Sequence, residues 1–120
     1  MIVAIDFGIT NTDVALSNKS QYKFFSIPSK NANESFIDEI ISLVDIDITE
    51  ISQIVVTGGK SNELNESFKG VNLTKISETD AIGYGTKEIY KIENEPFITL
   101  SCGTGLSLIH ISEPTRRPII

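Results

Sequence analysis

The residues best suited to chemistry lie near the N-terminus, in a short polar turn between two apolar runs. Asp6 directly follows the apolar run 2–5, and a second apolar run begins at Val14. The turn between them contains Gly8, Thr10, Asn11 and Thr12. Backbone N–H groups and hydroxyls in a tight turn suit phosphate oxygens, and a carboxylate beside them suits the Mg²⁺ that accompanies phosphates. The pattern also fits an ordinary β-hairpin with polar turn residues.

Two further glycine-containing turns follow apolar runs. Thr57-Gly58-Gly59 comes after the run 51–56, and Cys102-Gly103-Thr104-Gly105 comes after the run 97–101. Ligands of open α/β sheets bind beyond the ends of the strands. Three such turns at one edge of a sheet predict a ligand crevice more specifically than any one of them alone.

The hydrophobic pattern predicts the sheet that positions these turns. Three strands joined by short turns come first, and three more follow later in the chain, over residues 2–5, 14–16, 21–27, 51–56, 71–76 and 97–101. Residues 60–70 are expected to form a polar loop. This order predicts an α/β fold in which a mixed sheet, antiparallel over its first three strands, carries flanking helices.

Two helices are predicted. The first is capped by Asn31-Ala32-Asn33 and covers residues 34–44, with one apolar face made of Phe36, Ile37, Ile40, Ile41 and Val44. The second begins at Ser77 with a capping box that Asp80 completes. Its inner face is expected to contain Ala81, Ile82, Gly85 and Ile89.

Composition limits the classes of function. The chain has 120 residues and a formal net charge of −6, which argues against a nucleic-acid partner because such proteins present a basic surface. No apolar run approaches the roughly 18–20 residues of a membrane span. Cys102 is the single cysteine, which excludes an internal disulfide and fits a reducing cytoplasm. We therefore expect one cytoplasmic domain with neither a nucleic-acid nor a membrane partner.

The last fifteen residues differ in composition from the rest. Residues 1–105 contain no arginine and no histidine, whereas both arginines and His110 lie in the segment 106–120. The segment also looks like one reading frame of a common transposase sequencing adapter. We expect residues 1–105 to be native and 106–120 to be an adapter-derived tail, so His110 receives no functional role.

Glu78 is the candidate general base. It lies in the first turn of the second predicted helix, where the helix dipole favours an ionised carboxylate. The residues alone favour a structural role, in which Glu78 only complements that dipole.

Four motifs, in this order, resemble the N-terminal half of type II (eukaryotic-like) pantothenate kinases, members of the actin/hexokinase/sugar-kinase superfamily. They are Asp6-Phe7-Gly8-Ile9-Thr10, Val56-Thr57-Gly58-Gly59, Glu78-Thr79-Asp80-Ala81-Ile82-Gly83-Tyr84-Gly85 and Cys102-Gly103-Thr104-Gly105. The resemblance implies a ribonuclease-H-like, actin-like ATPase lobe over residues 1–105, with the second lobe missing. It also implies ATP-dependent phosphorylation of pantothenate to 4'-phosphopantothenate, the first step of coenzyme A biosynthesis, by a homodimer.

The resemblance also implies roles for residues. Asp6 would organise Mg²⁺, and Glu78 would accept the proton of the pantothenate hydroxyl. The ATP phosphates would be held by two turns, one of Gly8, Thr10, Asn11 and Thr12 and the other of Gly103, Thr104 and Gly105. Gly58 and Gly59 would lie on the substrate side. Without a second lobe, the 120-residue chain is expected to be inactive by itself.

Two positions depart from the family. A glycine usually stands where this chain has Ile9, and a lysine usually stands where it has Asp13. Asp13 therefore repels phosphate, faces away from it or helps to hold the metal. Thr10-Asn11-Thr12-Asp13 is also similar to the ATP-binding start of hydantoinase/oxoprolinase-type hydrolases, and Asp-x-Gly-x-Thr to type III pantothenate kinases. Another small-molecule kinase, an ATP-dependent hydrolase and a non-catalytic nucleotide-binding sensor remain alternatives.

Overall fold

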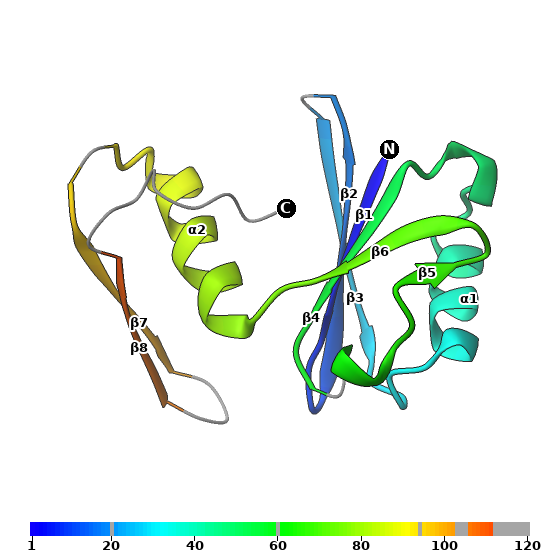
Figure 1. The fold of residues 1–120 in the computed structure, drawn as a ribbon, viewed down its shortest axis with the longest axis horizontal. Helices are drawn as coiled ribbons and strands as arrows, with labels where there is room; N and C mark the ends of the chain where they lie inside the picture. The colour runs from blue at the N-terminus through cyan, green and yellow to red at the C-terminus, as the bar shows by residue number, and fades with distance from the viewer. Residues whose placement is uncertain (20, 60, 94, 103–105, 112–120) are drawn as a thin grey trace. The chain divides into compact units, whose positions relative to one another are not determined.

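The computed structural model describes residues 1–19, 21–59, 61–93, 95–102 and 106–111, with 97–102 and 106–111 described by their backbone (Figure 1). The chain divides into two compact units, Met1–Lys75 and Ile76–Ile120.

The first unit is built on a six-stranded mixed sheet with the order β3-β2-β1-β4-β6-β5. Strand β1 pairs with β2 and β2 with β3 in antiparallel register, whereas β1–β4 and β4–β6 are parallel pairs. The bounds are β1 (Ile2–Phe7), β2 (Asn11–Asn18), β3 (Gln21–Pro28), β4 (Gln53–Thr57), β5 (Ser67–Phe68) and β6 (Val71–Lys75). The predicted mixed sheet with three antiparallel strands at its start is confirmed.

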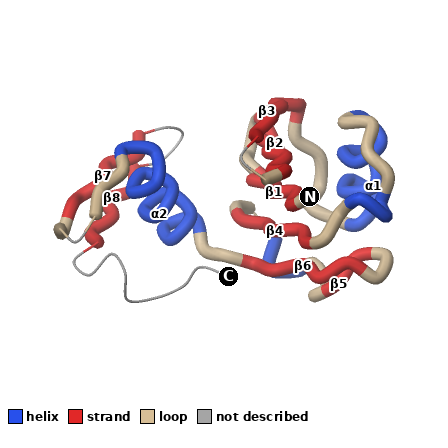
Figure 2. Tube along the Cα trace, turned by 90° about the horizontal axis from the view of Figure 1, so that it is seen from above, coloured by secondary structure: helices blue, strands red, loops and turns tan. Residues whose placement is uncertain are grey.

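Helix α1 (Glu34–Leu43) covers one face of this sheet (Figures 1 and 2). Its predicted apolar face is confirmed, because Phe36, Ile37, Ile40 and Ile41 are buried and Val44 packs against them from the C-cap position. Alternate residues of β1 and β2 complete the core, since side chains of a strand point in turn to opposite faces. These residues are Val3, Ile5, Phe7, Val14 and Leu16.

The edge strand β3 carries aromatic side chains on its surface. Tyr22 and Phe24 are exposed, and their rings stack with centroids 6.4 Å apart. In the register of β2 and β3, Phe24 pairs with Ala15, whereas its neighbour Phe25 pairs with the core residue Val14. The stacked pair therefore belongs to the sheet face opposite α1.

Two predicted boundaries in the first unit are wrong. The strand expected over 51–56 begins only at Gln53, because the short helix η1 (Ile48–Glu50) occupies the preceding turn and Ile51 reaches the core from outside the strand. Hydrogen bonds from the Thr49 backbone N–H and hydroxyl to the Asp47 cap lower the pKa of this carboxyl. The loop expected over 60–70 contains η2 (Ser61–Glu63) and β5, anchored by the buried side chains of Leu64 and Phe68.

The second unit contains α2 (Glu78–Tyr90) and the antiparallel pair β7 (Phe97–Cys102) and β8 (Leu106–Ile111). The Ser77 side chain caps α2 by accepting a hydrogen bond from the Asp80 backbone N–H, which confirms the Ser77 half of the predicted capping box. The inner position of Ile89 is wrong, because its side chain is 74% exposed. Gly83 is the buried residue of α2. Ile89 lies six residues further on, which is a rotation of about 240° around the helix axis, so its side chain points away from the face that contains Gly83.

Strand β8 lies within the predicted adapter-derived tail. An alternating apolar segment pairs with a neighbouring strand whatever its origin, so this pairing does not test the boundary at residue 105. Within the described ranges, no helix has both the length and the apolar character needed to cross a membrane.

Candidate functional site

The first two predicted turns meet at one edge of the sheet. Strands β1 and β4 are parallel, and Asp6 of β1 is in register with Thr57 of β4. The turn that follows each strand therefore leaves the sheet at the same edge, which is where ligands bind in open α/β sheets. This edge of the first unit, made of Asp6, residues 8–12 and residues 57–59, is the candidate site.

Glycine is required at position 8 because the backbone after β1 passes close to this position. Its backbone N–H donates a 3.0 Å hydrogen bond to the Asp6 carbonyl oxygen. A Cβ atom at Gly8 would lie 2.3 Å from the backbone oxygen of Asn11. Only glycine fits without moving this backbone, so the tight turn depends on the residue type at position 8.

Gly59 brings the second turn against the end of β1. Gly58 and Gly59 have positive φ angles of 81° and 42°. A Cβ atom at Gly59 would lie 2.9 Å from the Phe7 carbonyl oxygen, closer than a real Cβ atom approaches. The two glycines therefore allow the turn after β4 to pack on the turn after β1.

The tip of the first turn is open to solvent. Ile9, Thr10 and Asn11 are exposed, and Ile9 is 83% exposed. Within the described residues, the backbone N–H groups of Ile9 and Thr10 have no hydrogen-bond acceptor. Ile9 is absent from the described residues with positive φ, so the turn forms without a second glycine at this position. The tip thus offers donors that suit an anion.

Thr12 lies beneath the turn. Its side chain is 0% exposed, and its hydroxyl is 2.9 Å from the Ser29 hydroxyl. The sequence placed Thr12 among the phosphate ligands, whereas this position suits support of the turn from below.

Ser29 is a residue of the site that sequence reasoning missed. Its hydroxyl donates a 2.6 Å hydrogen bond to the Gly8 carbonyl oxygen, and its backbone N–H donates to the Thr10 carbonyl oxygen at 2.9 Å. Together with the contact to Thr12, these bonds tie the turn to the end of β3. The available signal was weak: a serine directly after Pro28, where the third strand ends.

Replacing Ser29 with alanine is expected to destabilise the first unit by about 1–2 kcal/mol, because the buried Thr12 hydroxyl loses its partner. The free energy of unfolding from urea titration measures this loss. Ser26→Ala, at an exposed position of strand β3 just before Ser29, is the matched control and should change this free energy by less than about 0.5 kcal/mol. Equal effects of the two substitutions would contradict the role given to Ser29.

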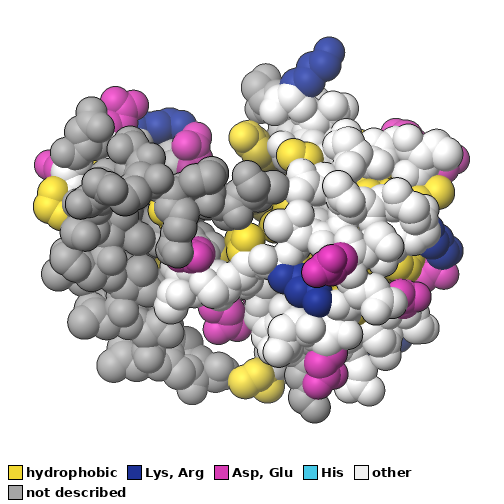
Figure 3. Space-filling view, viewed as in Figure 1, with side chains coloured by type: hydrophobic (Ala, Val, Ile, Leu, Met, Phe, Trp, Pro, Cys, Tyr) yellow, Lys and Arg dark blue, Asp and Glu magenta, His cyan; other side chains and the backbone are white. Residues whose placement is uncertain are grey.

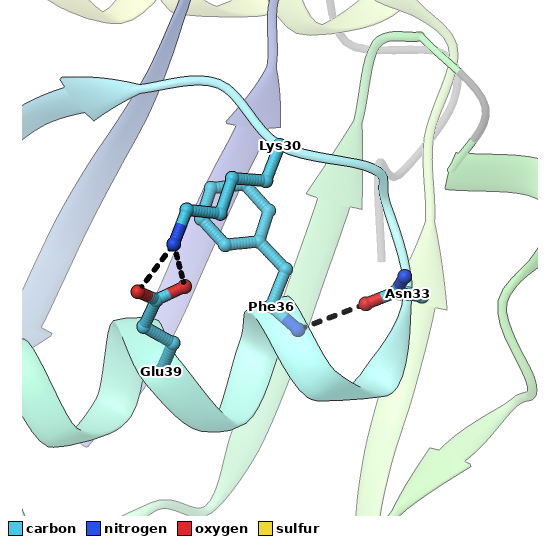
Figure 4. Close-up of polar contacts among 4 residues, drawn as sticks. All are labelled: Lys30, Asn33, Phe36 and Glu39. Carbon is cyan, nitrogen blue, oxygen red and sulfur yellow. Dashed lines mark hydrogen bonds and ion pairs between the residues drawn. The ribbon is translucent and has the colours of Figure 1, made fainter.

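The segment after Ser29 is fixed to helix α1 (Figure 4). The Lys30 ammonium group lies 2.6 Å and 2.9 Å from the two carboxylate oxygens of Glu39. The Asn33 side-chain oxygen accepts a 2.9 Å hydrogen bond from the Phe36 backbone N–H and caps the helix. The Lys30–Glu39 pair is exposed and adds little stability, but it fixes the segment between β3 and α1 to the helix, next to Ser29.

Oxygen donors suitable for a metal line the same edge. Asp6 is exposed at the end of β1, and Thr57 is its neighbour on β4. Thr57 is only 8% exposed, and its hydroxyl has no hydrogen-bond partner within the described part of the chain. Such a buried hydroxyl costs about 1–3 kcal/mol, and a bound ligand would recover that cost. Among the described residues, no three His, Cys, Asp or Glu side chains are placed so that they could hold a metal ion together, so a metal here would use hydroxyl, phosphate or water oxygens as well.

The described structure does not place the remaining predicted site residues relative to this edge. Glu78 is the first residue of α2, in the second unit, and its side chain is exposed. Gly103, Thr104 and Gly105 lie outside the described residues. Their approach to the turn after β1 stays a prediction.

Among the described residues, the Lys side chains do not gather at one element (Figure 3). On the face drawn in Figure 3, the described Lys side chains are scattered among Asp and Glu side chains. In the described part of the first unit, Lys30 pairs with Glu39 and Lys69 with Asp38. An anion bound at the edge after β1 would therefore rely on the turn's backbone and a cation rather than on a described patch of lysines.

The chain is similar to proteins of known family. A protein from Bacillus anthracis named type II pantothenate kinase is 30% identical over 115 residues, which cover 91% of this chain and 39% of that protein. A second of the same name from Bacillus cereus is 31% identical over 113 residues, with 91% and 40% covered. The chain thus spans about two-fifths of the length of these relatives. No family model matches the chain.

A solved structure shows the fold. A ROK family protein from Streptococcus pneumoniae, solved in complex with sucrose, superposes with a TM-score of 0.62 at 16% identity and covers 94% of this chain and 46% of its own. The predicted actin-like ATPase lobe is confirmed at the level of fold. The predicted resemblance to type II pantothenate kinases is confirmed by the two relatives.

Proposed function

Starting from this resemblance and this fold, we propose that the complete protein is a kinase that transfers the γ-phosphoryl group of ATP to the terminal hydroxyl of pantothenate. The observation that supports it most is the glycine-dependent turn after β1, which presents N–H donors beside the Asp6 carboxylate. A protein that moves a phosphoryl group must mainly position it and compensate its charge. We also propose that the protein is cytoplasmic, in keeping with its single cysteine, and that it is a homodimer, as the resemblance implies.

The turn after β1 holds the β- and γ-phosphates in this proposal. Gly8, Thr10 and Asn11 supply its surface, and Thr12 supports it through Ser29. Gly103, Thr104 and Gly105 form the second phosphate-binding turn, and Gly58 and Gly59 face the substrate. Asp6 holds Mg²⁺, whose charge, once bound, balances that of the phosphates.

Glu78 acts as the general base. Its carboxylate takes the proton of the pantothenate hydroxyl while the hydroxyl oxygen forms a bond to the γ-phosphorus. The bond between that phosphorus and the β–γ bridging oxygen breaks, and ADP leaves with the electron pair. The proton on Glu78 then passes to water, so the products are phosphopantothenate, ADP and H⁺.

An acceptor panel tests this function. The complete protein is incubated with ATP and Mg²⁺, and ADP release is followed with pantothenate, a series of hexoses, 5-oxoproline and a hydantoin. ADP release that requires pantothenate and yields a phosphorylated product is expected. Turnover with a sugar alone would identify another small-molecule kinase, and turnover with a lactam or hydantoin a hydrolase. Nucleotide binding without turnover on any acceptor would indicate a sensor; each of these three results contradicts the proposal.

A further inference from the structure

The register of the sheet places three oxygen-bearing side chains in one row. Asp13 of β2 lies directly opposite Asp6 of β1 in the antiparallel pair. On the other side of β1, Thr57 of β4 is the parallel partner of Asp6. Residues in register on neighbouring strands point to the same face of a sheet. Asp13 therefore does not face away from the candidate site, although its position in the sequence left that possibility open.

The row lies on the sheet face opposite α1. The alternate residues Ile5 and Phe7 of β1 are buried in the core with α1, as are Val14 of β2 and Val56 of β4. Asp6, Asp13 and Thr57 occupy the intervening positions and so belong to the other face. Asp6 and Asp13 are exposed, which leaves them accessible to an ion from solvent.

The two carboxylates oppose each other at short range. Directly opposite residues of an antiparallel pair have Cβ atoms about 4.5–5.5 Å apart, and like charges in such a pair repel. Asp13 forms no ion pair within the described residues. A divalent cation placed against both carboxylates reverses this repulsion into attraction, which favours a metal over any neutral ligand.

The Thr57 hydroxyl is an independent indication of a ligand. It is buried, it has no hydrogen-bond partner among the described residues, and its register directs it to the same face as the two carboxylates. Two carboxylates and a hydroxyl are hard oxygen donors, which suit Mg²⁺ and Mn²⁺ rather than thiolate- or imidazole-preferring metals. Water molecules complete the shell of such an ion.

We propose that Asp13, together with Asp6 and the Thr57 hydroxyl, binds a divalent cation in the absence of nucleotide. The role of this cation in nucleotide binding rests on the proposed function, but its binding to these three side chains does not. A lysine at position 13, which the resemblance would place there, brings one fixed positive charge to the turn. Asp13 replaces that charge with a ligand for a metal ion. The nucleotide affinity of this protein therefore depends more steeply on the concentration of the cation than that of a protein with lysine at position 13.

Metal binding without nucleotide tests the proposal. Mn²⁺, which takes the same oxygen ligands as Mg²⁺, is titrated into the complete protein and followed by electron paramagnetic resonance, with neither ATP nor pantothenate present. One saturable Mn²⁺ site that Mg²⁺ displaces is expected. Asp13→Asn should weaken it at least tenfold, whereas Asp45→Asn, at an exposed residue whose positive φ asparagine tolerates, should leave it unchanged.

Thr57→Val supplies a second variant that keeps the shape of the side chain and removes the hydroxyl. It should weaken Mn²⁺ binding and raise the melting temperature of the metal-free protein, because a buried unpartnered hydroxyl is removed. Absence of a Mn²⁺ site in the unsubstituted protein, or equal affinity in Asp13→Asn, would overturn the proposal. Since no acceptor or nucleotide is present, failure here is distinguishable from a negative acceptor panel.

Discussion

Replacing Glu78 with glutamine is expected to lower kcat for pantothenate phosphorylation by roughly 10²–10⁴-fold, the usual contribution of a general base. Glutamine has nearly the same shape and remains a good helix former, but its amide cannot take the hydroxyl proton. Removal of one negative charge from the first turn of α2 costs only about 0.3–1 kcal/mol, so the protein stays folded. Steady-state ADP release by the complete protein measures the effect, and circular dichroism verifies the fold.

Asp80→Asn is the matched control for Glu78→Gln. It removes the same charge from the same turn of α2, and its backbone N–H still donates to the Ser77 cap. We expect kcat within about threefold of the unsubstituted protein, since helix-end charges act weakly. If Asp80→Asn lost more activity than Glu78→Gln, the base would be wrongly assigned.

Replacing Gly8 with alanine is expected to weaken ATP binding at least tenfold and to destabilise the first unit. The added Cβ would lie 2.3 Å from the Asn11 backbone oxygen, and a backbone atom cannot move aside as a flexible side chain does. The turn must open, which moves the N–H groups away from the phosphates. Overpacking of this kind costs about 1–3 kcal/mol. Calorimetric titration with Mg²⁺–ATP and urea unfolding measure the two effects separately.

Gly85→Ala is the control for the substitution itself. Gly85 lies inside α2, and among the described residues no atom outside the neighbouring helix backbone lies within 4 Å of an added Cβ there. Alanine in a helix interior is favoured over glycine by about 0.5–1 kcal/mol, so this variant should be at least as stable as the parent. ATP affinity of Gly8→Ala equal to that of Gly85→Ala would show that the turn after β1 does not hold the phosphates.

The sequence predicted the framework of the first unit because its signals are local. Alternating and continuous apolar runs marked the strands, and Asn33 marked the start of α1. The sequence-based prediction was wrong where the position of an element depends on one buried residue. Phe68 anchors β5 inside a segment that reads as a polar loop, and Ile51 reaches the core from outside β4. In α2, Gly83 rather than an isoleucine marks the buried face.

The sequence predicted only those parts of the candidate site that belong to recognisable motifs. Glycines that follow apolar runs indicated the turns after β1 and β4. The parallel register of the two strands then places both turns at one edge of the sheet. Ser29 carried no signal, because its contacts with Gly8 and Thr12 depend on how β3 returns to the turn. The face on which Asp13 lies could not be known from spacing either, since a shift of one residue in register turns a strand side chain to the other face.

Hydrogen–deuterium exchange of the complete protein, with and without a non-hydrolysable ATP analogue and Mg²⁺, tests the phosphate-binding role of the turn after β1 most directly. Ile9 and Thr10 are exposed, and their N–H groups have no acceptor within the described residues, so we expect these groups to exchange quickly in the free protein. We predict that the analogue slows exchange in a peptide spanning residues 8–12 and in one spanning 57–59. Protection elsewhere with unchanged exchange in both peptides would contradict a nucleotide site at this edge of the sheet.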